Sequence, residues 1–178
     1  MKALFLDRDG VLNSLVSRDG GWFSPRSIED FQVSKGAGLV LRGFRNLGFS
    51  IFVVTNQPDI SRGTLQQETL LRFHRLLIEE LGPLEFFTCA HTSEANCDCR
   101  KPKSGLITSA CTQYSIDIPT SWLIGDQVSD IIAGRAAGLR TVLLYSPATP
   151  ASIRRFPNER ADFEAYSLKE ALNLISSC

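Results

Sequence analysis

Short apolar runs rich in aromatic and β-branched residues alternate along this chain with longer segments of helical periodicity. The runs expected to be strands are Ala3 to Leu6, Ser50 to Thr55, Phe86 to Ala90, Trp122 to Gly125 and Thr141 to Tyr145. The expected helices are Gly38 to Leu47, Leu65 to Leu81, Gly105 to Tyr114, Asp130 to Ala137 and Leu168 to Ile175. This alternation predicts an α/β fold in which a parallel, doubly wound sheet lies between two layers of helices.

The composition limits the class of protein. Of the 178 residues, 43% are hydrophobic, which predicts a single domain over residues 1–178. Lysine plus arginine and aspartate plus glutamate number 19 each, so no overall charge favours nucleic acid or an anionic membrane. No apolar stretch is long enough to span a bilayer, and the start of the chain runs into the first strand without a cleavable signal. We therefore expect a cytoplasmic protein, by default a monomer, with a surface loop at 147–157.

Two aspartates follow the first predicted strand. Asp7 and Asp9 lie at the carboxyl end of the run, where ligands bind in open α/β sheets, and Gly10 lets the chain turn sharply beside them. One carboxylate of such a pair can attack a phosphoryl group, and the other can pass a proton to the leaving oxygen. Alternatively, the aspartate pair only caps the loop after the strand. Which interpretation holds depends on the residues at the ends of the other strands.

Polar groups of related purpose follow three further strands. The segment Thr55-Asn56-Gln57 offers a hydroxyl and backbone N–H groups for phosphoryl oxygens. Arg100 and Lys101 offer cations that can neutralise charge in a phosphoryl transfer, and Asp126 offers oxygens suited to Mg²⁺. Because carboxyl ends of parallel strands meet at one edge of a sheet, the sequence predicts a phosphoryl-transfer site there.

The segments DRDG (7–10), TNQ (55–57), CRKP (99–102) and GDxxxD (125–130) resemble the four motifs of the haloacid dehalogenase superfamily of phosphohydrolases. The resemblance covers the chain from residue 3 to about residue 145. It implies a Rossmann-like three-layer α/β/α sandwich and a Mg²⁺-dependent phosphatase that works through an aspartyl-phosphate. The lengths of 14–50 and 58–88 predict that no separate cap domain covers the site, so that loops set its specificity.

The resemblance also assigns roles to single residues. It implies Asp7 as nucleophile and Asp9 as general acid and base. It implies that Thr55 and Lys101 contact the phosphoryl group, and that Asp7, the Asp9 backbone carbonyl and Asp126 hold Mg²⁺. Asp130 is expected to orient Lys101 or start a helix rather than bind the metal.

A second cluster accompanies the third motif. Cys89 and His91 are followed by Cys97 and Cys99, which together offer three thiolates and an imidazole to a structural Zn²⁺. A closed four-ligand shell leaves no position for water, so the cluster is expected to clip a loop and aim the adjacent cations. The alternative is a group of free cysteines near a core strand.

Within the superfamily, C-x-H followed by C-x-C-R-K-P resembles D-glycero-D-manno-heptose 1,7-bisphosphate phosphatases and the related histidinol-phosphate phosphatases. The heptose branch acts in nucleotide-heptose and lipopolysaccharide biosynthesis. Three features favour the heptose branch: Asn13, the segment 60–63 and the lack of an appended dehydratase domain. The expected substrate-binding residues are Asn13, Asn56, Gln57, Arg62 and Arg100. Pro58, Asp59 and Gln127 depart from the pattern of the heptose enzymes.

Other residues receive structural interpretations. Arg8 should point away from Asp7 and Asp9 by strand alternation, and His74 should be an exposed or half-exposed helix residue. Trp22, in the expected specificity loop from Ser14 to Phe31, can stack on a sugar or cover the edge of the core. Two rival functions stay open, a non-catalytic phosphosugar-binding module and a nucleic-acid-binding zinc domain, although the first needs only one aspartate and the second a basic surface.

Overall fold

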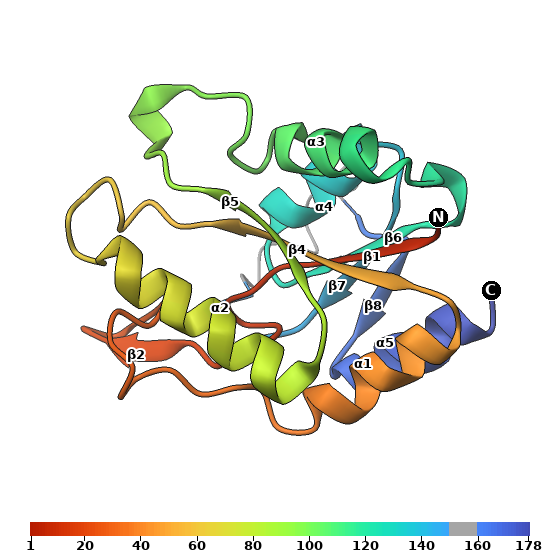
Figure 1. Ribbon diagram of the computed structural model, residues 1–178, viewed down its shortest axis with the longest axis horizontal. Coiled ribbons are helices and arrows are strands. Elements are labelled where there is room, and N and C mark those ends of the chain that lie inside the picture. The colour runs from red at the N-terminus through yellow and green to blue at the C-terminus, as the bar shows by residue number, and fades with distance from the viewer. Residues whose placement is uncertain (150–159) are drawn as a thin grey trace.

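The computed structural model describes residues 1–149 and 160–178, so most of the loop expected at 147–157 lies outside the described residues. Its main sheet has six strands in the order β5-β4-β1-β6-β7-β8, and every neighbouring pair is parallel (Figure 1). The strands are β1 (Ala3–Leu6), β4 (Ser50–Asn56), β5 (Glu85–Cys89), β6 (Trp122–Gly125), β7 (Arg140–Leu144) and β8 (Phe163–Ala165). The five predicted strands are thus confirmed to within one residue at each end, and the sheet is parallel as predicted.

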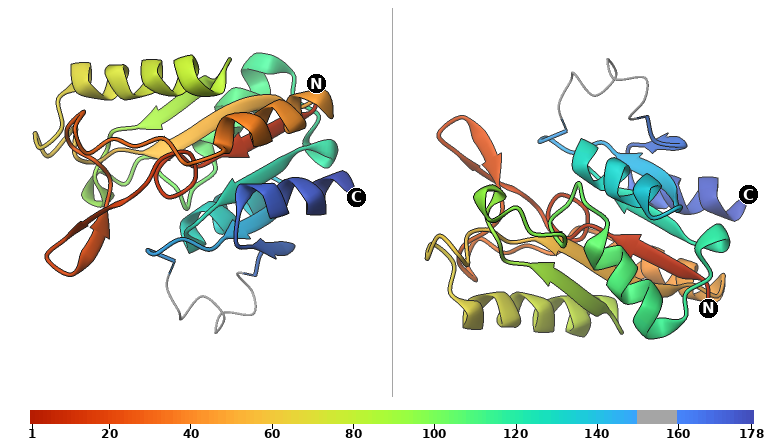
Figure 2. Two further views of the ribbon diagram at one scale, coloured as in Figure 1. Left: turned by 90° about the horizontal axis from the view of Figure 1, so that it is seen from below. Right: turned by 90° about the horizontal axis from the view of Figure 1, so that it is seen from above.

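Helices cover both faces of this sheet (Figure 2). One layer holds α1 (Ala37–Asn46), α2 (Gln67–Leu81) and α5 (Leu168–Ser176), and the other holds α3 (Gly105–Tyr114) and α4 (Val128–Ala136). Side chains of β1 alternate between the layers, with Leu4 and Leu6 in one core cluster and Phe5 in the other. This confirms the doubly wound arrangement. No helix in the described part of the chain is long and apolar enough to cross a lipid bilayer.

A small hairpin before α1 is absent from the predicted elements. Its strands, β2 (Val16–Arg18) and β3 (Gly21–Phe23), pair only with each other. Asp19 and Gly20 both have positive φ, 48° and 78°, as a two-residue hairpin turn requires. An Asp-Gly pair between two strands is the sequence signal of such a turn, but three-residue strands show too little alternation to predict. The three-residue strand β8 and the short 3₁₀ helices η1 (Ser93–Ala95) and η2 (Ile118–Thr120) were likewise not predicted.

Two structural interpretations were wrong. His74 is buried with 9% of its surface exposed, and its ring stacks on Phe86 with 3.9 Å between ring centroids. It lies on the face of α2 that packs against the sheet. Arg8 does not point away from Asp9 but binds its carboxylate, because β1 ends at Leu6 and strand alternation does not extend to position 8. The guanidinium of Arg8 is fully buried and lies over the ring of Phe73.

Candidate active site

The candidate site lies at the carboxyl edge of the central strands. Asp7 follows β1, Asp126 follows β6 and Asn56 ends β4, and these three strands are neighbours in the sheet. They open into a cavity of about 350 Å³. Its lining consists of Asp7, Asp9, Leu15, Trp22, Phe23, Ser24, Asn56, Lys101, Asp126, Gln127, Ser129, Asp130 and Ala148. The hairpin supplies the aromatic side of this lining, and the loops that follow the strands, together with the first turn of α4, supply the charged side.

Lys101 is the buried cation of the cavity. Its Nζ donates to Asp7 Oδ1 over 2.8 Å and to the carbonyl oxygen of Val54 over 2.7 Å, and it lies 2.5 Å from Asp130 Oδ1. Two hydrogen-bond acceptors and one ion-pair partner therefore surround the ammonium group. Burial alone would lower the pKa of Lys101, but the charges of Asp130 and Asp7 raise it. Lys101 is therefore held as a cation beside Asp7.

The carboxylates outnumber this cation. Oxygen atoms of Asp7, Asp126 and Asp130 lie within 4.8 Å of one another, so three carboxylates face one ammonium group. Burial raises the pKa of Asp7 despite the opposing charge of Lys101, and burial together with Asp130 raises the pKa of Asp126. Mutual repulsion of this kind is relieved when a divalent cation binds between the carboxylates.

Asp126 has one oxygen engaged and one unpartnered. Its Oδ2 accepts hydrogen bonds from Ser146 Oγ over 2.6 Å and from Gln127 Nε2 over 3.2 Å. Its Oδ1 is buried and has no hydrogen-bond partner within the described structure. Gly10 lies against this carboxylate with φ +85°, and a Cβ there would come within 2.3 Å of Asp126 Oδ2. A buried, unpartnered carboxylate oxygen beside two other carboxylates fits a hard cation such as Mg²⁺.

Asp9 is saturated with donors. Oδ1 accepts from Arg8 Nη2 and Asn13 Nδ2, each over 2.9 Å. Oδ2 accepts from Arg8 Nη2 over 2.9 Å, from Gln57 Nε2 over 2.7 Å and from Ser24 Oγ over 3.0 Å. Burial would raise the pKa of Asp9, but the charge of Arg8 and the hydrogen bonds outweigh it and hold that pKa below its usual range. Asp9 is thus an ionised, firmly oriented carboxylate in the resting site.

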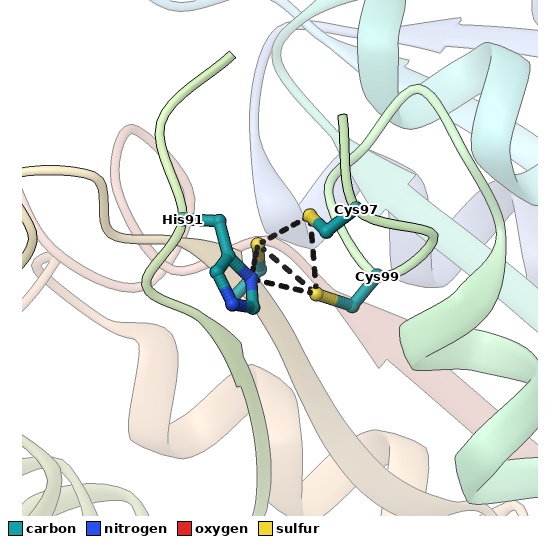
Figure 3. Close-up of side chains that lie close together, drawn as sticks. His91, Cys97 and Cys99 are labelled. Atoms are coloured by element: carbon teal, nitrogen blue, oxygen red, sulfur yellow. Dashed lines mark hydrogen bonds between the residues drawn. The ribbon is translucent and has the colours of Figure 1, made fainter. Parts of the chain in front are cut away.

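The Cys/His cluster lies on the loop between β5 and α3. Figure 3 shows the His91 ring and the sulfurs of Cys97 and Cys99 pointing toward one another. The three sulfur atoms, including that of Cys89, are 3.3 to 3.7 Å apart, and His91 Nδ1 lies 3.2 Å from Cys99 Sγ. A tetrahedral zinc site with Zn–S bonds of about 2.3 Å places its sulfurs about 3.8 Å apart. The four donors therefore have nearly the spacing of a closed zinc shell.

Hydrogen bonds connect this loop to the cavity. The Asn56 side chain donates to the carbonyl oxygen of Lys101 over 3.0 Å and accepts from its N–H over 3.1 Å. Arg100 Nη1 donates to the carbonyl oxygen of His91 over 3.1 Å. Lys101 comes only two residues after Cys99, and hydrogen bonds from Asn56 and Arg100 hold the segment between them. The position of the buried ammonium group therefore depends on the geometry of the cluster.

Comparison with known proteins agrees with this geometry. A family model described as HAD-hydrolase-like matches residues 98–171. A D-glycero-beta-D-manno-heptose-1,7-bisphosphate 7-phosphatase of Helicobacter pylori J99 is 40% identical over 154 residues, which cover 82% of this chain and 83% of the relative. A D-glycero-alpha-D-manno-heptose-1,7-bisphosphate 7-phosphatase of Photorhabdus laumondii is 37% identical over 164 residues, or 85% of this chain and 86% of the relative. The chain belongs to this family of HAD-like phosphatases.

A solved structure supports the fold of the phosphatase. The D,D-heptose 1,7-bisphosphate phosphatase from B. bronchiseptica, complexed with magnesium and phosphate, superposes with a TM-score of 0.86. The match covers 99% of each chain at 23% sequence identity. This phosphatase therefore has the fold of that enzyme along nearly its whole length.

The sequence-predicted residues occupy three kinds of position in the phosphatase. Asp7, Asp9, Asn56, Lys101 and Asp126 line the cavity. Thr55, Gln57 and Asn13 lie buried behind it, where Gln57 Nε2 donates to Thr55 Oγ1 and both Gln57 and Asn13 donate to Asp9. Arg62 and Arg100 are not part of the lining. The side chain of Arg62 is 51% exposed and pairs with Asp59, while Arg100 contacts the Cys/His loop.

Two serine side chains that contact the carboxylates were not predicted. Ser24 lies within the expected specificity loop, but nothing in the sequence indicates that its hydroxyl reaches Asp9. Ser146 follows β7, and only the sheet order brings it to Asp126. A lone serine after a hairpin or a strand carries no signal of its own, so neither contact can be read from a motif.

Proposed function

We propose that the phosphatase removes the 7-phosphate of D-glycero-D-manno-heptose 1,7-bisphosphate, a step of nucleotide-heptose biosynthesis, through an aspartyl-phosphate on Asp7. The main support is one observation, the buried cluster of Asp7, Lys101 and Asp126 on the floor of the cavity. The substrate rests on the relatives at 37 to 40% identity, which are named for the alpha and the beta anomer of this sugar.

Asp7 is the proposed nucleophile. Lys101 holds Asp7 Oδ1 at 2.8 Å, and this contact directs the carboxylate while Lys101 remains a cation. The in-line attack forms the bond from an Asp7 oxygen to phosphorus and breaks the bond from phosphorus to the sugar oxygen. Asp130 accepts from the Gln127 N–H and pairs with Lys101, which supports a role in placing the cation rather than in binding the metal.

Asp9 is the proposed acid and base. It is ionised in the resting site, so the proton that it delivers to the sugar oxygen must be taken up as the negatively charged phosphate enters beside it. After the sugar leaves, the Asp9 carboxylate takes a proton from the water that hydrolyses the aspartyl-phosphate. Arg8 and Asn13 remain in contact with Asp9 Oδ1 and keep the carboxyl oriented.

Two metal ions complete the proposal. Asp7, the Asp9 backbone carbonyl and the unpartnered Oδ1 of Asp126 would hold Mg²⁺, which neutralises phosphoryl charge when bound. Cys89, His91, Cys97 and Cys99 would hold Zn²⁺ in a closed shell that positions the loop before Lys101.

The hairpin is the proposed sugar-binding wall. Trp22 and Phe23 line the cavity with 45% of each residue exposed, which agrees with stacking on a sugar and not with covering the core. Thr55, Asn56 and Gln57 are the proposed phosphoryl-side groups. Arg62 and Arg100, the other proposed substrate-binding residues, are not among the residues that line the cavity.

The test is Mg²⁺-dependent phosphate release, as kcat/KM, from both anomers of the heptose bisphosphate and from histidinol phosphate. We expect a strong preference for one heptose anomer. A preference for histidinol phosphate would overturn the proposed substrate and leave the chemistry intact. The Trp22→Ala variant should raise KM for the heptose several-fold with little change in kcat, because stacking contributes to binding in the ground state and the transition state alike.

A further inference from the structure

Two segments far apart in the sequence meet on one oxygen of Asp9. Ser24 comes directly after β3, and Gln57 comes directly after β4. Both donate to Asp9 Oδ2. Gln57 is well anchored, since its N–H donates to the Cys89 carbonyl oxygen over 2.7 Å and its side chain also contacts Thr55. Ser24 lacks such an anchor in the sheet, because β2 and β3 pair only with each other and a lone hairpin is marginally stable.

An ion pair joins these segments two residues further along each of them. Arg26 Nε lies 2.6 Å from Asp59 Oδ2, and the Asp59 side chain is only 12% exposed. Asp59 is itself fixed, because its carbonyl oxygen accepts from the N–H groups of Thr64 and Leu65 over 3.0 and 3.1 Å. The Arg26–Asp59 pair therefore ties the segment after the hairpin to a rigid turn beside Gln57.

Ser24 differs chemically from the other partners of Asp9. Arg8 has only N–H donors, and the amides of Asn13 and Gln57 point their N–H groups at the carboxylate. A hydroxyl can rotate and accept a hydrogen bond instead of donating one. Among the partners of Asp9 Oδ2, Ser24 is thus the one that can donate to the carboxylate and can also accept a hydrogen bond from the protonated carboxyl. It also lines the cavity.

We propose that Arg26 and Asp59 are positioning residues, which hold Ser24 against Asp9 so that the carboxyl can carry and deliver the proton to the leaving oxygen. This inference rests on the acid role of Asp9 proposed above. It assigns a role to Asp59, one of the residues that depart from the pattern of the heptose enzymes. It also implies that the segment after the hairpin takes part in the proton transfer through Ser24.

The test compares two leaving groups. An alkyl oxygen, as in the heptose bisphosphate, needs a proton to leave, whereas the phenolate of p-nitrophenyl phosphate does not. The variants are Ser24→Ala, Arg26→Ala, Asp59→Ala and Arg26→Ala/Asp59→Ala. Each should lower kcat/KM for the alkyl phosphate about tenfold, and the value for p-nitrophenyl phosphate by less than about twofold. The double variant should be no worse than Asp59→Ala alone, since both break the Arg26–Asp59 pair and Asp59→Ala already removes the partner of Arg62 as well.

A control separates the effect of the Arg26–Asp59 ion pair, called the latch below, from a general loss of structure. Arg45→Ala removes another arginine that ties distant segments, through bonds of 2.8 Å to the carbonyl oxygens of Leu81 and Pro83, but at the opposite edge of the sheet. It should leave the ratio of the two kcat/KM values unchanged. The ratio does not depend on how much of a variant is folded, because both substrates meet the same active molecules.

An equal loss on both substrates, or no loss on either, in the Arg26 and Asp59 variants would overturn the inference. Asp9→Asn serves as the reference and should show the largest dependence on the leaving group. If Asp9→Asn itself lowers both values equally, the proposed acid role fails and the latch fails with it. If the heptose is not hydrolysed at all, glycerol phosphate replaces it as the alkyl substrate, so that an error in the proposed sugar is detected separately.

Discussion

The two candidate metal sites of this chain are built in opposite ways. The Cys/His cluster draws its four donors from 11 consecutive positions, 89–99, and its donor atoms are nearly in mutual contact. The carboxylate site draws Asp7 and Asp126 from the ends of two neighbouring strands that are far apart in sequence. One site is closed and local, and the other is open toward a cavity and assembled by the sheet.

The difference indicates a division of labour. Thiolates and an imidazole that complete a shell leave no place for a substrate, so such a site stabilises a loop. Carboxylates with one unpartnered oxygen leave room for a phosphoryl group beside a cation. Removing metal from the closed site should therefore act mainly on stability, and disturbing the open site should act mainly on turnover.

The largest effect is expected from Asp7→Asn. This change removes the nucleophile and should lower turnover by at least about 1000-fold. It also removes one of three crowded carboxylates, so the midpoint of thermal unfolding of the metal-free protein should not fall. Steady-state kinetics and calorimetry measure the two effects. Appreciable residual activity in pure protein would contradict the assignment of the nucleophile.

The next largest effect is expected from Cys99→Ser, which breaks the closed site. Loss of zinc should lower stability by several kcal/mol, which corresponds to a drop of about 10 °C in Tm. Activity should fall less steeply, since Lys101 loses only the support of its loop. Metal analysis with thermal unfolding tests this, and Cys111→Ser, at a half-buried cysteine outside the cluster, is the control. A parent protein that contains no zinc, with a Tm that Cys99→Ser leaves unchanged, would show that the cluster consists of free thiols.

A smaller effect is expected from Ser146→Ala. Without this hydroxyl, Asp126 Oδ2 loses its 2.6 Å hydrogen bond and can turn away from the site. Mg²⁺ affinity, measured by calorimetric titration of the resting protein, should fall about tenfold while zinc content stays the same. Equal Mg²⁺ affinity in the variant and the parent would mean that Gln127 alone suffices to orient Asp126.

The last prediction concerns the two histidines. His91 belongs to the closed site, whereas His74 is buried against Phe86 with its Nε2 unpartnered. Burial, with the nearby charge of Arg8, lowers the pKa of His74 to about 4. The unfolded chain takes up this proton near pH 6.5, so the stability that neutral His74 contributes is present above pH 6.5 and is lost as the pH falls toward 4.

The loss should amount to about 3 kcal/mol between pH 7 and pH 4. Denaturant unfolding of His74→Phe, which keeps a ring against Phe86, should show a shallower decline over that range than the parent. Parallel curves for the two proteins would mean that His74 is already protonated in the folded state.

Some of this could be predicted because its signals are local. Apolar runs of strand length, glycines with φ of +86° and +82° at positions 48 and 138 after α1 and α4, and the spacing of the cysteines all depend on neighbours in sequence. The hairpin was missed although Asp19-Gly20 is a turn signal, because its strands are short and belong to no larger sheet. His74 was misplaced because its polar side chain suggested a solvent-exposed position, although the spacing of Leu70, Phe73, Leu77 and Leu81 puts it on the apolar face of α2.

The sequence by itself determined the layered α/β fold, through the alternation of apolar runs with helical segments, and it indicated the chemistry through the residue types at the ends of its strands. Only the tertiary structure decided which groups surround each carboxylate. Ser24 and Gln57 converge on Asp9, and Ser146 reaches Asp126, through contacts between segments whose separation in sequence leaves no periodic trace. Such contacts depend on sheet order and loop path. The orientation and pKa of each carboxylate are therefore properties of the folded chain.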